Sequence, residues 1–528
     1  MKNIIKNFFY LAMVLYALSI LLIVFGFLSG HTYLFELFAL ALALFGIFLL
    51  NRTQFSDIKL NKKVFYSLFI LGIAIIILFR AIPYFNNSVP LGYDAGIYKY
   101  VFENGLANND HWIINQITTE PLFLYAMHFL HNFMSSQFML TWLLMIFCAV
   151  LGVAVYFVVS EYANKTTGLI ALFLYSLSVV QFYTFTYMYY KNIVAMSFML
   201  FSLYFLKRYE KNSKKGDLIA FIILGGLLGA IHRSTFYIYG LSYFFYVFLS
   251  PIKQGKYDFQ RLKINFISGV LILAIALMFY IGRYFESITM MFGPVLQGFI
   301  NPGKVAGTFV SFSIFNLSIL PYIPLVFLGL FYFIRKKDFN ILIMWFIINS
   351  VIVYFQFFFF GRFTITLDLV FIILAAFGFS IIISNKRVLG IGIMLVLLIS
   401  AGVLVYHQAN DAKPRISQSE LKTISYLNHT ESNAFVMATS SPYSPWILGY
   451  SYRRTIAPGL FDYDNSTPKQ WLAFWNANNL SVMKTFMSNY PKPIYVYIGA
   501  DQKDSLSQYN ECFTLYYALR GKIYKYIC

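Results

Sequence analysis

A short polar stretch, LGYDAGIYKY at residues 91–100, places the carboxylate of Asp94 between two tyrosines in a chain that is otherwise strongly apolar. A positioned carboxylate can take the proton from an attacking hydroxyl group and accelerate such a reaction by about 10²–10⁴-fold. The alternative interpretation is a solvated side chain near a membrane surface. The downstream residues favour chemistry, because Trp112 is followed by Glu120 and then by PLFLYAMHFL, an amphipathic stretch that predicts a helix at the membrane interface.

Basic residues at the predicted outer ends of hydrophobic segments could bind an anionic leaving group such as a phosphate, which needs cationic contacts more than a proton donor. Each one alone is better explained as a side chain that reaches toward lipid headgroups. As a set they are informative, because the positive-inside rule disfavours cations on the outer side. The set comprises Arg80, Lys99, Lys191, Arg233, Arg283, Lys304 and Arg362, with His232 beside Arg233. We expect Arg233, Arg283 and Arg362 to be the main phosphate contacts, followed by Lys191.

Acidic and imidazole side chains near Asp94 could hold a divalent metal ion. Glu120 or Asp110 could join Asp94 as oxygen ligands. His111 or His128 could supply nitrogen, but no ligand spacing is diagnostic. Glu120 is explained at least as well as a helix-start residue that the helix dipole favours. The residues therefore predict no particular cofactor.

The composition predicts that membrane-spanning helices position these residues. Of the 528 residues, 59% are hydrophobic and only 12% are charged, and the mean hydropathy is +0.67. These values are far more apolar than those of an average soluble protein. A spanning helix needs roughly 20 apolar residues, and about 13 such segments can be placed. They lie near residues 8–29, 32–50, 64–81, 137–160, 168–186, 191–207, 217–231, 235–250, 263–282, 312–334, 339–359, 364–384 and 388–406.

Charge placement predicts the orientation of these segments. Lys and Arg residues gather in short clusters between alternate hydrophobic segments, at 52–63, 207–215, 253–263, 335–337 and 386–387. The positive-inside rule puts these clusters and the N-terminus in the cytoplasm. Loop 82–136 and the segment 407–528 then lie outside, in a multi-pass protein of the plasma membrane. The formal net charge of +19 thus reports orientation and not a nucleic-acid partner.

Three regions are expected along the chain: a helical hairpin with its loop at 1–63, a transmembrane module at 64–406, and an extracytoplasmic α/β domain at 407–528. In the last region, NAFVMATS and KPIYVYIGA predict short buried strands, whereas SELKTISYLN and PKQWLAFWNANN predict helices. Cys512 and Cys528 could pair if this region faces an oxidising space. Because the sequence fixes neither their distance nor their compartment, we do not expect a disulfide.

The chain resembles the GT-C glycosyltransferases, and within them the branch of protein mannosyltransferases and aminoarabinose transferases. The resemblance rests on Asp94 and Tyr98, then Trp112, then EPLFLYAMHFL before a span and a basic inner loop. The later GRFTITLDLVFIILAAFGF, with a basic residue entering a late span, adds to it. It implies a polytopic α-helical GT-C-like fold and sugar transfer from a polyprenyl-phosphate carrier. The acceptor would be a protein, a lipid or a glycan on the outer face of the membrane.

In such an inverting transferase Asp94 would be the base for the acceptor hydroxyl. Tyr93 and Tyr98 would be either sugar contacts or interface anchors. The stretch TYMYYKNIVAM carries Lys191 where the family often has a second acidic residue, which weakens the case for a shared metal site.

Other functions fit part of the pattern. A transporter or flippase for lipid-linked glycans would also have many spans, but transporters tend to place ionisable residues within their spans. Here the polar groups gather on one predicted face. A polysaccharide polymerase or ligase shares the outer site and the lipid donor, and it is harder to separate. An oligosaccharyltransferase is disfavoured, because its tryptophan-rich signature is missing from the outer domain and GYDAG resembles it only superficially.

Overall fold

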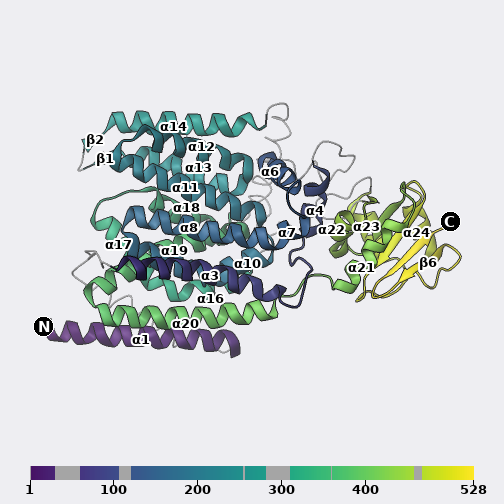
Figure 1. The fold of residues 1–528 in the computed structure, drawn as a ribbon, viewed down its shortest axis with the longest axis horizontal. Helices are drawn as coiled ribbons and strands as arrows, with labels where there is room; N and C mark the ends of the chain where they lie inside the picture. The colour runs from purple at the N-terminus through teal and green to yellow at the C-terminus, as the bar shows by residue number, and fades with distance from the viewer. Residues whose placement is uncertain are drawn as a thin grey trace. The chain divides into compact units, whose positions relative to one another are not determined.

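The chain folds into two compact units in the computed structural model (Figure 1), which describes residues 2–29, 60–105, 120–253, 256–280, 310–357, 360–456 and 466–528. The helical unit comprises Met1–Ile82, Met145–Phe185 and Tyr189–Asp411. The mixed unit comprises Pro83–Leu144, Thr186–Met188 and Ala412–Cys528. The first long loop of the chain and the C-terminal segment therefore belong to the same unit.

The helical unit is built from long apolar helices that pack side by side. Its described helices are α1 (Lys2–Ser29), α3 (Lys62–Ala81), α8 (Leu144–Tyr162), α9 (Lys165–Ser176), α10 (Val179–Thr186), α11 (Tyr190–Asn212), α12 (Lys215–Ile231), α13 (Arg233–Leu249), α14 (Phe259–Met278), α16 (Phe312–Ile319), α17 (Ile323–Arg335), α18 (Ile341–Tyr354), α19 (Phe360–Asn385) and α20 (Arg387–Asp411). Strands β1 (Ile252–Lys253) and β2 (Lys256–Tyr257) form a small hairpin before α14.

Seven of the described helices are long and apolar enough to cross a membrane, or eight if α9 and α10 are counted as one broken span. The predicted count of 13 is not confirmed. The predicted single span at 168–186 is two helices that meet at 54°. The predicted span at 32–50, which was to complete the N-terminal hairpin, lies outside the described residues.

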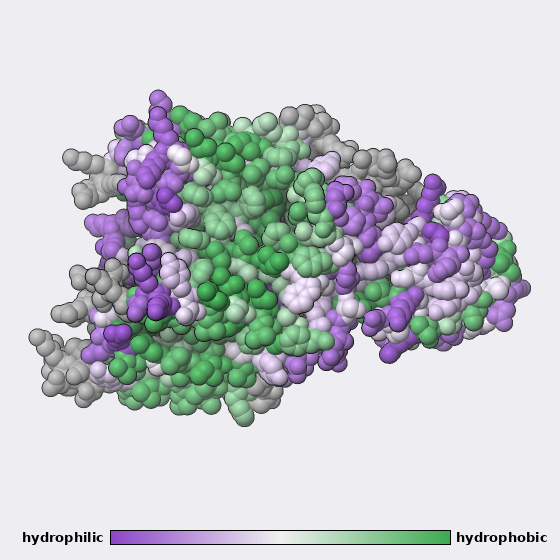
Figure 2. Space-filling model, in the orientation of Figure 1, coloured by the Kyte–Doolittle hydropathy of each residue, from purple (hydrophilic) through white to green (hydrophobic). Residues whose placement is uncertain are grey.

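Burial separates the inner helices of this unit from the outer ones. The spanning part of α19 is 100% buried, whereas that of α3 is 22% buried. Ile70 on α3 and Ile399 on α20 expose about two thirds of their apolar side chains. Figure 2 shows the broad apolar band that such residues make on the visible face. Because soluble proteins rarely expose apolar patches of this extent, the helical unit has the surface of a multi-pass membrane protein.

The mixed unit contains helices from two distant parts of the sequence. The described helices of its loop region are α4 (Ala95–Asn104), α6 (Pro121–His131) and α7 (Ser136–Phe138). Those of the C-terminal segment are α21 (Gln418–Tyr426), α22 (Ser444–Tyr450), α23 (Pro468–Trp475) and α24 (Leu480–Met487). The helix predicted within loop 82–136 is present as α6, and the two predicted C-terminal helices are confirmed as α21 and α23.

The C-terminal segment also forms a five-stranded sheet with the order β4-β3-β5-β7-β6. Its strands are β3 (Phe435–Ala438), β4 (Arg454–Thr455), β5 (Ile494–Ile498), β6 (Phe513–Ala518) and β7 (Lys522–Tyr526). β3 pairs in parallel with β4 and β5, and β7 pairs antiparallel with β5 and β6. The two predicted buried strands are confirmed as β3 and β5, and the expected small α/β fold is present.

Local sequence signals explain how the C-terminal helices begin and pack. Ser417 and Glu420 form a capping box at the start of α21, with each side chain bonding the backbone of the other residue. On α23, Trp471 and Phe474 turn toward Phe486 of α24, with ring centroids 4.9 and 4.5 Å apart. These rings pack against the apolar side chains of the sheet and form the core of the segment.

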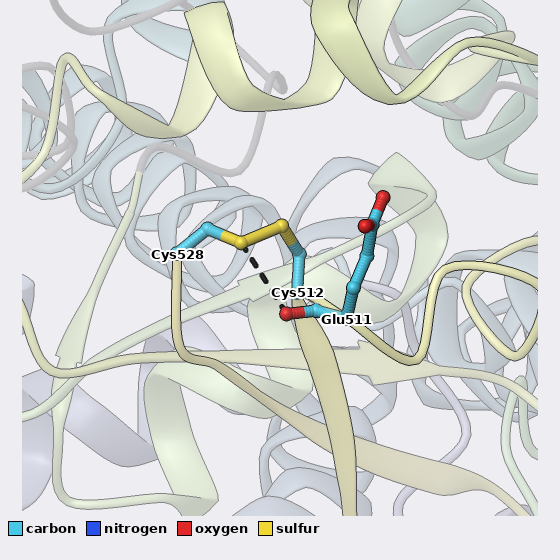
Figure 3. The surroundings of a disulfide bond; sticks show 3 residues. All are labelled: Glu511, Cys512 and Cys528. Carbon is cyan, nitrogen blue, oxygen red and sulfur yellow. Dashed lines mark hydrogen bonds between the residues drawn. A yellow bond between two sulfur atoms is a disulfide. The ribbon is translucent and has the colours of Figure 1, made fainter.

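Cys512 and Cys528 form a disulfide (Figure 3), so our expectation of two unpaired thiols is wrong. Cys512 directly precedes β6 and Cys528 follows β7, and the antiparallel register pairs Phe513 with Tyr526. This pairing brings the two cysteine Cα atoms to 4.9 Å. The sulfur of Cys528 also lies 3.4 Å from the carbonyl oxygen of Glu511. The sequence could not give this proximity, because neither strand of the hairpin was predicted.

Candidate active site

Asp94 occupies the N-cap position of α4 and is half-buried. Aspartate at this position usually accepts a hydrogen bond from the first turn. Here the side chain makes no capping hydrogen bond. The carboxylate is therefore not engaged in holding its own helix together, although it lies at the end of the helix that favours negative charge.

Two glycines near Asp94 let its segment pass close to other parts of the mixed unit. A Cβ atom on Gly92 would lie 2.2 Å from Cβ of Met188. A Cβ atom on Gly96 would lie 1.8 Å from the carbonyl oxygen of Pro445, and one on Gly449 would lie 2.2 Å from that of Gly96. Because neither Gly96 nor Gly449 has room for a side chain, the start of α4 lies directly against α22.

Lys99 and Glu103 join α4 to its neighbours through an ion pair. Lys99 Nζ donates to Glu103 Oε2 at 2.7 Å and to the hydroxyl of Tyr452 at 2.8 Å. The other carboxylate oxygen of Glu103 accepts from Ser136 Oγ at 2.6 Å. Lys99 is 7% exposed. The sequence placed it among the cations on the outer side of the membrane, and within the mixed unit its charge is paired with that of Glu103.

Tyr93 lies beside Asp94 and is fixed by the C-terminal segment. Its hydroxyl donates to the carbonyl oxygen of Ser441 at 3.1 Å. Burial raises the pKa of Tyr93 to about 12, and the charge of Asp94 also raises it, whereas the charge of Arg415 opposes the change. Tyr93 is therefore a neutral donor at physiological pH. Arg415, an exposed residue near this tyrosine, lies in the C-terminal segment and so outside the set of cations expected at the ends of spans.

Tyr98 and Glu120 lie where α4 meets α6. The ring of Tyr98 is 6% exposed and packs on Phe102 and Phe123, with centroids 5.8 and 6.1 Å apart. This contact occupies much of the ring, so Tyr98 serves the packing of the two helices. Glu120 is 4% exposed and is the N-cap residue of α6, without a capping hydrogen bond from its side chain. This position agrees with the interpretation of Glu120 as a helix-start residue that the helix dipole favours.

The described residues contain no group of three or more His, Cys, Asp or Glu side chains placed to hold a metal ion. His128, a possible nitrogen ligand, instead donates from Nδ1 to the carbonyl oxygen of Phe102 at 2.7 Å. Asp110 and His111 lie outside the described residues. The side chains around Asp94 that are described do not fit a metal site, and the chemistry below uses none.

Three of the expected phosphate contacts lie at helix N-termini of the helical unit. Lys191 is the second residue of α11, Arg233 the first of α13, and Arg362 the third of α19. Each helix runs from its cation toward one of the basic clusters at 207–215, 253–263 and 386–387. The positive-inside rule predicts that these clusters share one side, and we therefore expect the three cations to share the other. All three are half-buried.

Helix stability does not explain these positions, because cations at N-termini oppose the helix dipole. The N–H groups of a first turn and a nearby cation together suit an anion. Arg283, the remaining expected contact, lies outside the described residues, as does Lys304.

His232 has a structural role at the start of α13. Its Nδ1 accepts from the backbone N–H of Thr235 at 3.3 Å and so caps the helix. The hydroxyl of Thr235 in turn donates to Asn192 Oδ1 at 2.7 Å. This chain of contacts fixes the start of α13, and with it Arg233, against α11.

The sequence analysis missed a buried polar network inside the helical unit. Asp368 of α19 is fully buried, and its Oδ2 accepts from Ser178 Oγ at 2.7 Å and from Gln181 Nε2 at 2.9 Å. The guanidinium of Arg80 donates to the carbonyl oxygen of Gln181 at 3.4 Å.

This network contains two charged residues. Arg80, expected at the outer end of its span, is 0% exposed, and its guanidinium donates to the carbonyl oxygens of Ile76 and Gln181. Charges within spans were expected to be scarce, and Asp368 is such a charge, detectable as a carboxylate inside an apolar run, which is by default a site of interest.

Comparisons with known proteins relate the fold to membrane transferases. The dolichyl-phosphate-mannose-protein mannosyltransferase family model matches residues 119–281, less than half of the chain. ArnT from Cupriavidus metallidurans, solved with bound undecaprenyl phosphate, has a TM-score of 0.59 and 10% identity over 89% of this chain and 99% of ArnT. The Archaeoglobus fulgidus oligosaccharyltransferase in its apo form has a TM-score of 0.57 and 14% identity over 84% of this chain and 70% of the enzyme. This chain has the GT-C fold. The GT-C-like architecture expected from the sequence is thereby confirmed.

A second structure of the archaeal enzyme, AglB, contains an inhibitory peptide and dolichol-phosphate, and has a TM-score of 0.54 and 14% identity over 88% of this chain and 74% of AglB. No curated protein sequence matches this chain. At identities this low the likeness concerns the fold. The sequence-based argument against an oligosaccharyltransferase is therefore untouched, since it rests on a missing tryptophan-rich signature.

Proposed function

We propose that this protein is an inverting membrane glycosyltransferase that moves a sugar from a polyprenyl-phosphate carrier to an acceptor hydroxyl. The observation that carries the proposal is Asp94, a half-buried carboxylate at the start of α4 that makes no capping bond and is held in place by close backbone contacts. The GT-C fold, shared with ArnT bound to undecaprenyl phosphate, supports the choice of donor.

In the proposed reaction Asp94 takes the proton of the acceptor hydroxyl as the hydroxyl oxygen attacks the anomeric carbon. The new C–O bond forms on the face opposite the carrier. The bond between the anomeric carbon and the phosphate oxygen breaks, and the carrier phosphate leaves with the electron pair. No proton donor is required for a phosphate leaving group, but its developing negative charge needs stabilisation.

Arg233, Arg362 and Lys191 are the proposed contacts for that phosphate. They are expected on one side of the helical unit and begin helices whose N-terminal N–H groups also favour an anion. His232 is proposed to act through Arg233, by capping the helix on which the arginine lies. Arg283 stays a sequence-based candidate for the same role.

The proposed reaction takes place on the outer face of the plasma membrane. The basic clusters support this orientation through the positive-inside rule. The disulfide between Cys512 and Cys528 supports it independently, because such bonds persist in oxidising compartments. The mixed unit, which carries Asp94, would then face the cell exterior.

The rival function of a transporter gains one observation, the fully buried Asp368 inside α19. Its Oδ2 already accepts two hydrogen bonds from Ser178 and Gln181, which suits a structural carboxylate better than a transport site. The shared fold with two kinds of transferase also favours transfer over transport. A polysaccharide polymerase or ligase would use the same site and differ only in its acceptor.

The test is sugar transfer by the full-length protein in liposomes, supplied with a panel of undecaprenyl- and dolichyl-phosphate sugars and with acceptors of all three classes. We expect transfer from at least one donor, and a rate about 10²–10⁴-fold lower for Asp94→Asn. Asp501→Asn, which removes an exposed carboxylate of the same unit, is the control and should transfer normally. Full activity in Asp94→Asn would exclude this mechanism, and movement of the intact lipid without transfer would favour the transporter.

A further inference from the structure

An open groove of about 470 Å³ lies in the mixed unit and has no part in the reaction described above. Its walls come from α21, from the short turn Leu427–His429, from α22 and from Ser88. Ser88 precedes Asp94 by six residues. Tyr450, which also lines the groove, follows Gly449, the glycine that packs on α4. Cavities of roughly 300–1,000 Å³ are typical of small-molecule sites, so the groove is large enough for a ligand.

One wall of the groove is a supported aromatic surface. The ring of Tyr426 stacks on Tyr517 at 3.8 Å between centroids with an angle of 14° between the planes. The centroid of the His429 ring lies 4.7 Å from that of the Tyr426 ring. Because the ring of Tyr426 is held from behind, it can offer a face to a ligand at little cost in side-chain entropy.

The groove is also lined by a second supported tyrosine. Tyr450 is 8% exposed, and its ring stacks on Trp446 with centroids 5.8 Å apart. The ammonium group of Lys99 lies 4.8 Å from the centroid of the same ring. These contacts fix the position of the ring.

Two buried polar atoms of groove residues have no hydrogen-bond partner among the residues that the structure describes. They are the hydroxyl of Tyr450 and Oδ1 of Asn428. Buried polar atoms without a partner are rare in folded proteins. Two residues that line the groove thus each carry an unpaired polar atom, one a donor and one an acceptor.

The turn that carries Asn428 is held rigidly. Arg453 donates from Nη2 to the carbonyl oxygen of Thr430 at 2.8 Å and from Nε to the hydroxyl of Thr430 at 3.1 Å. It also bonds the carbonyl oxygen of Asn428. The position of Asn428 is therefore set before any ligand arrives.

We propose that this groove binds the saccharide chain of the acceptor, an assignment that rests on the proposed function and narrows its acceptor to a glycan. Sugars combine hydroxyl groups, which can pair with Asn428, Tyr450 and the amide of Gln418, with apolar C–H faces that stack on aromatic rings. Peptides more often add to a sheet edge or lay an apolar helix face in a groove. The described walls of this groove are helices and a turn, with Lys422 supplying a positive charge.

The binding test uses the full-length protein in lipid nanodiscs and saturation-transfer NMR with three probes: maltotetraose, chitotetraose and tetragalacturonate. We expect at least one of them to bind, and its dissociation constant to rise about 10-fold in Tyr426→Leu and in Asn428→Ala. Lys484→Gln, which changes an exposed lysine on α24 of the same unit, should bind as the wild type does. Lys422→Gln should weaken tetragalacturonate if that acid is the ligand, and because Lys422 is exposed this variant tests the groove without disturbing the fold.

The proposal is overturned if none of the three saccharides binds, or if they bind equally to wild type and to the groove variants. It is also overturned if the groove substitutions weaken the binding of an acceptor peptide and leave saccharide binding unchanged. Asp94→Asn should bind the saccharide normally while losing transfer, so the two proposals fail separately. Loss of saccharide binding with unchanged transfer would remove the groove and leave the transferase intact.

Discussion

Two aspartates of this protein have opposite surroundings. Asp94 of the mixed unit is half-buried at a helix N-terminus and makes no capping bond. Asp368 of the helical unit is fully buried in the middle of α19, and two side-chain donors bond its Oδ2. The fully buried Asp368 offers no surface to a substrate hydroxyl, whereas Asp94 keeps part of its surface exposed. The comparison teaches that position at the edge of a unit, and not the residue type, selects the candidate base.

The largest effect is expected from removing the side chain of Asp368, the buried acceptor. Asp368→Leu leaves the donors of Ser178 and Gln181 without their acceptor, at roughly 1–3 kcal/mol for each. We therefore expect a large fall in the midpoint of thermal unfolding, measured in detergent. Asp368→Asn keeps an acceptor oxygen and should lose much less stability while retaining transfer. Equal midpoints for Asp368→Leu and the wild type would show that the network does not hold the helices together.

A smaller effect is expected from moving Asp94 without changing it. Gly449→Ala places a Cβ atom 2.2 Å from the carbonyl oxygen of Gly96, so the start of α4 must shift. A displacement of about 1 Å at a reacting group can cost about 10²-fold in rate. We expect transfer to fall by this order with a normal donor affinity.

The matched control for that substitution is Gly216→Ala on α12, where an added Cβ would meet no atom within 4 Å. It should leave the transfer rate unchanged. If both glycine variants transfer at the wild-type rate, then α22 does not position Asp94.

The smallest effect concerns a third carboxylate, Glu431, on the surface of the mixed unit. Hydrogen bonds from Lys525 and Tyr495 lower the pKa of Glu431 to about 2. Because the folded pKa lies below the ordinary value of 4.5, this group stabilises the fold above about pH 4.5. That contribution is lost as the pH falls through 2. Since Glu431 is 43% exposed, solvent screens the pair and the contribution is small.

Unfolding midpoints between pH 6 and pH 2 would measure this contribution for the wild type and Glu431→Gln. We expect the gap between the two proteins to narrow steadily as the pH falls. A constant gap over the whole range would mean that the surface carboxylate is not linked to stability through its proton.

The elements predicted well from the sequence are those with local signals. α6 begins at Pro121 after Glu120, and the capping pair Ser417 and Glu420 marks the start of α21. The apolar runs of β3 and β5 are buried, as their composition suggested. By contrast, the break between α9 and α10 follows Ser176 without glycine or proline nearby. Its Ser178 is held by Asp368 of α19, a contact that no local pattern reveals.

The candidate site divides in the same way. Asp94 could be selected as a candidate from the sequence, because it is a lone carboxylate in a polar interruption of an apolar chain. Its fixation was not predictable, because Gly96 and Gly449 are distant in sequence and meet only in the folded mixed unit. The burial of Lys99 depends on the same tertiary contact, through Tyr452. Charged residues could thus be found from the sequence, whereas their partners required the fold.

The most direct measurement is a comparison of donor binding and turnover in Asp94→Asn, using whichever polyprenyl-phosphate sugar the wild type transfers. If Asp94 is the base for the acceptor, the rate constant for transfer falls by about 10²–10⁴-fold. The dissociation constant of the donor should stay within about threefold of the wild-type value, because the carboxylate does not bind the phosphate. Transfer at the wild-type rate in Asp94→Asn would contradict the account.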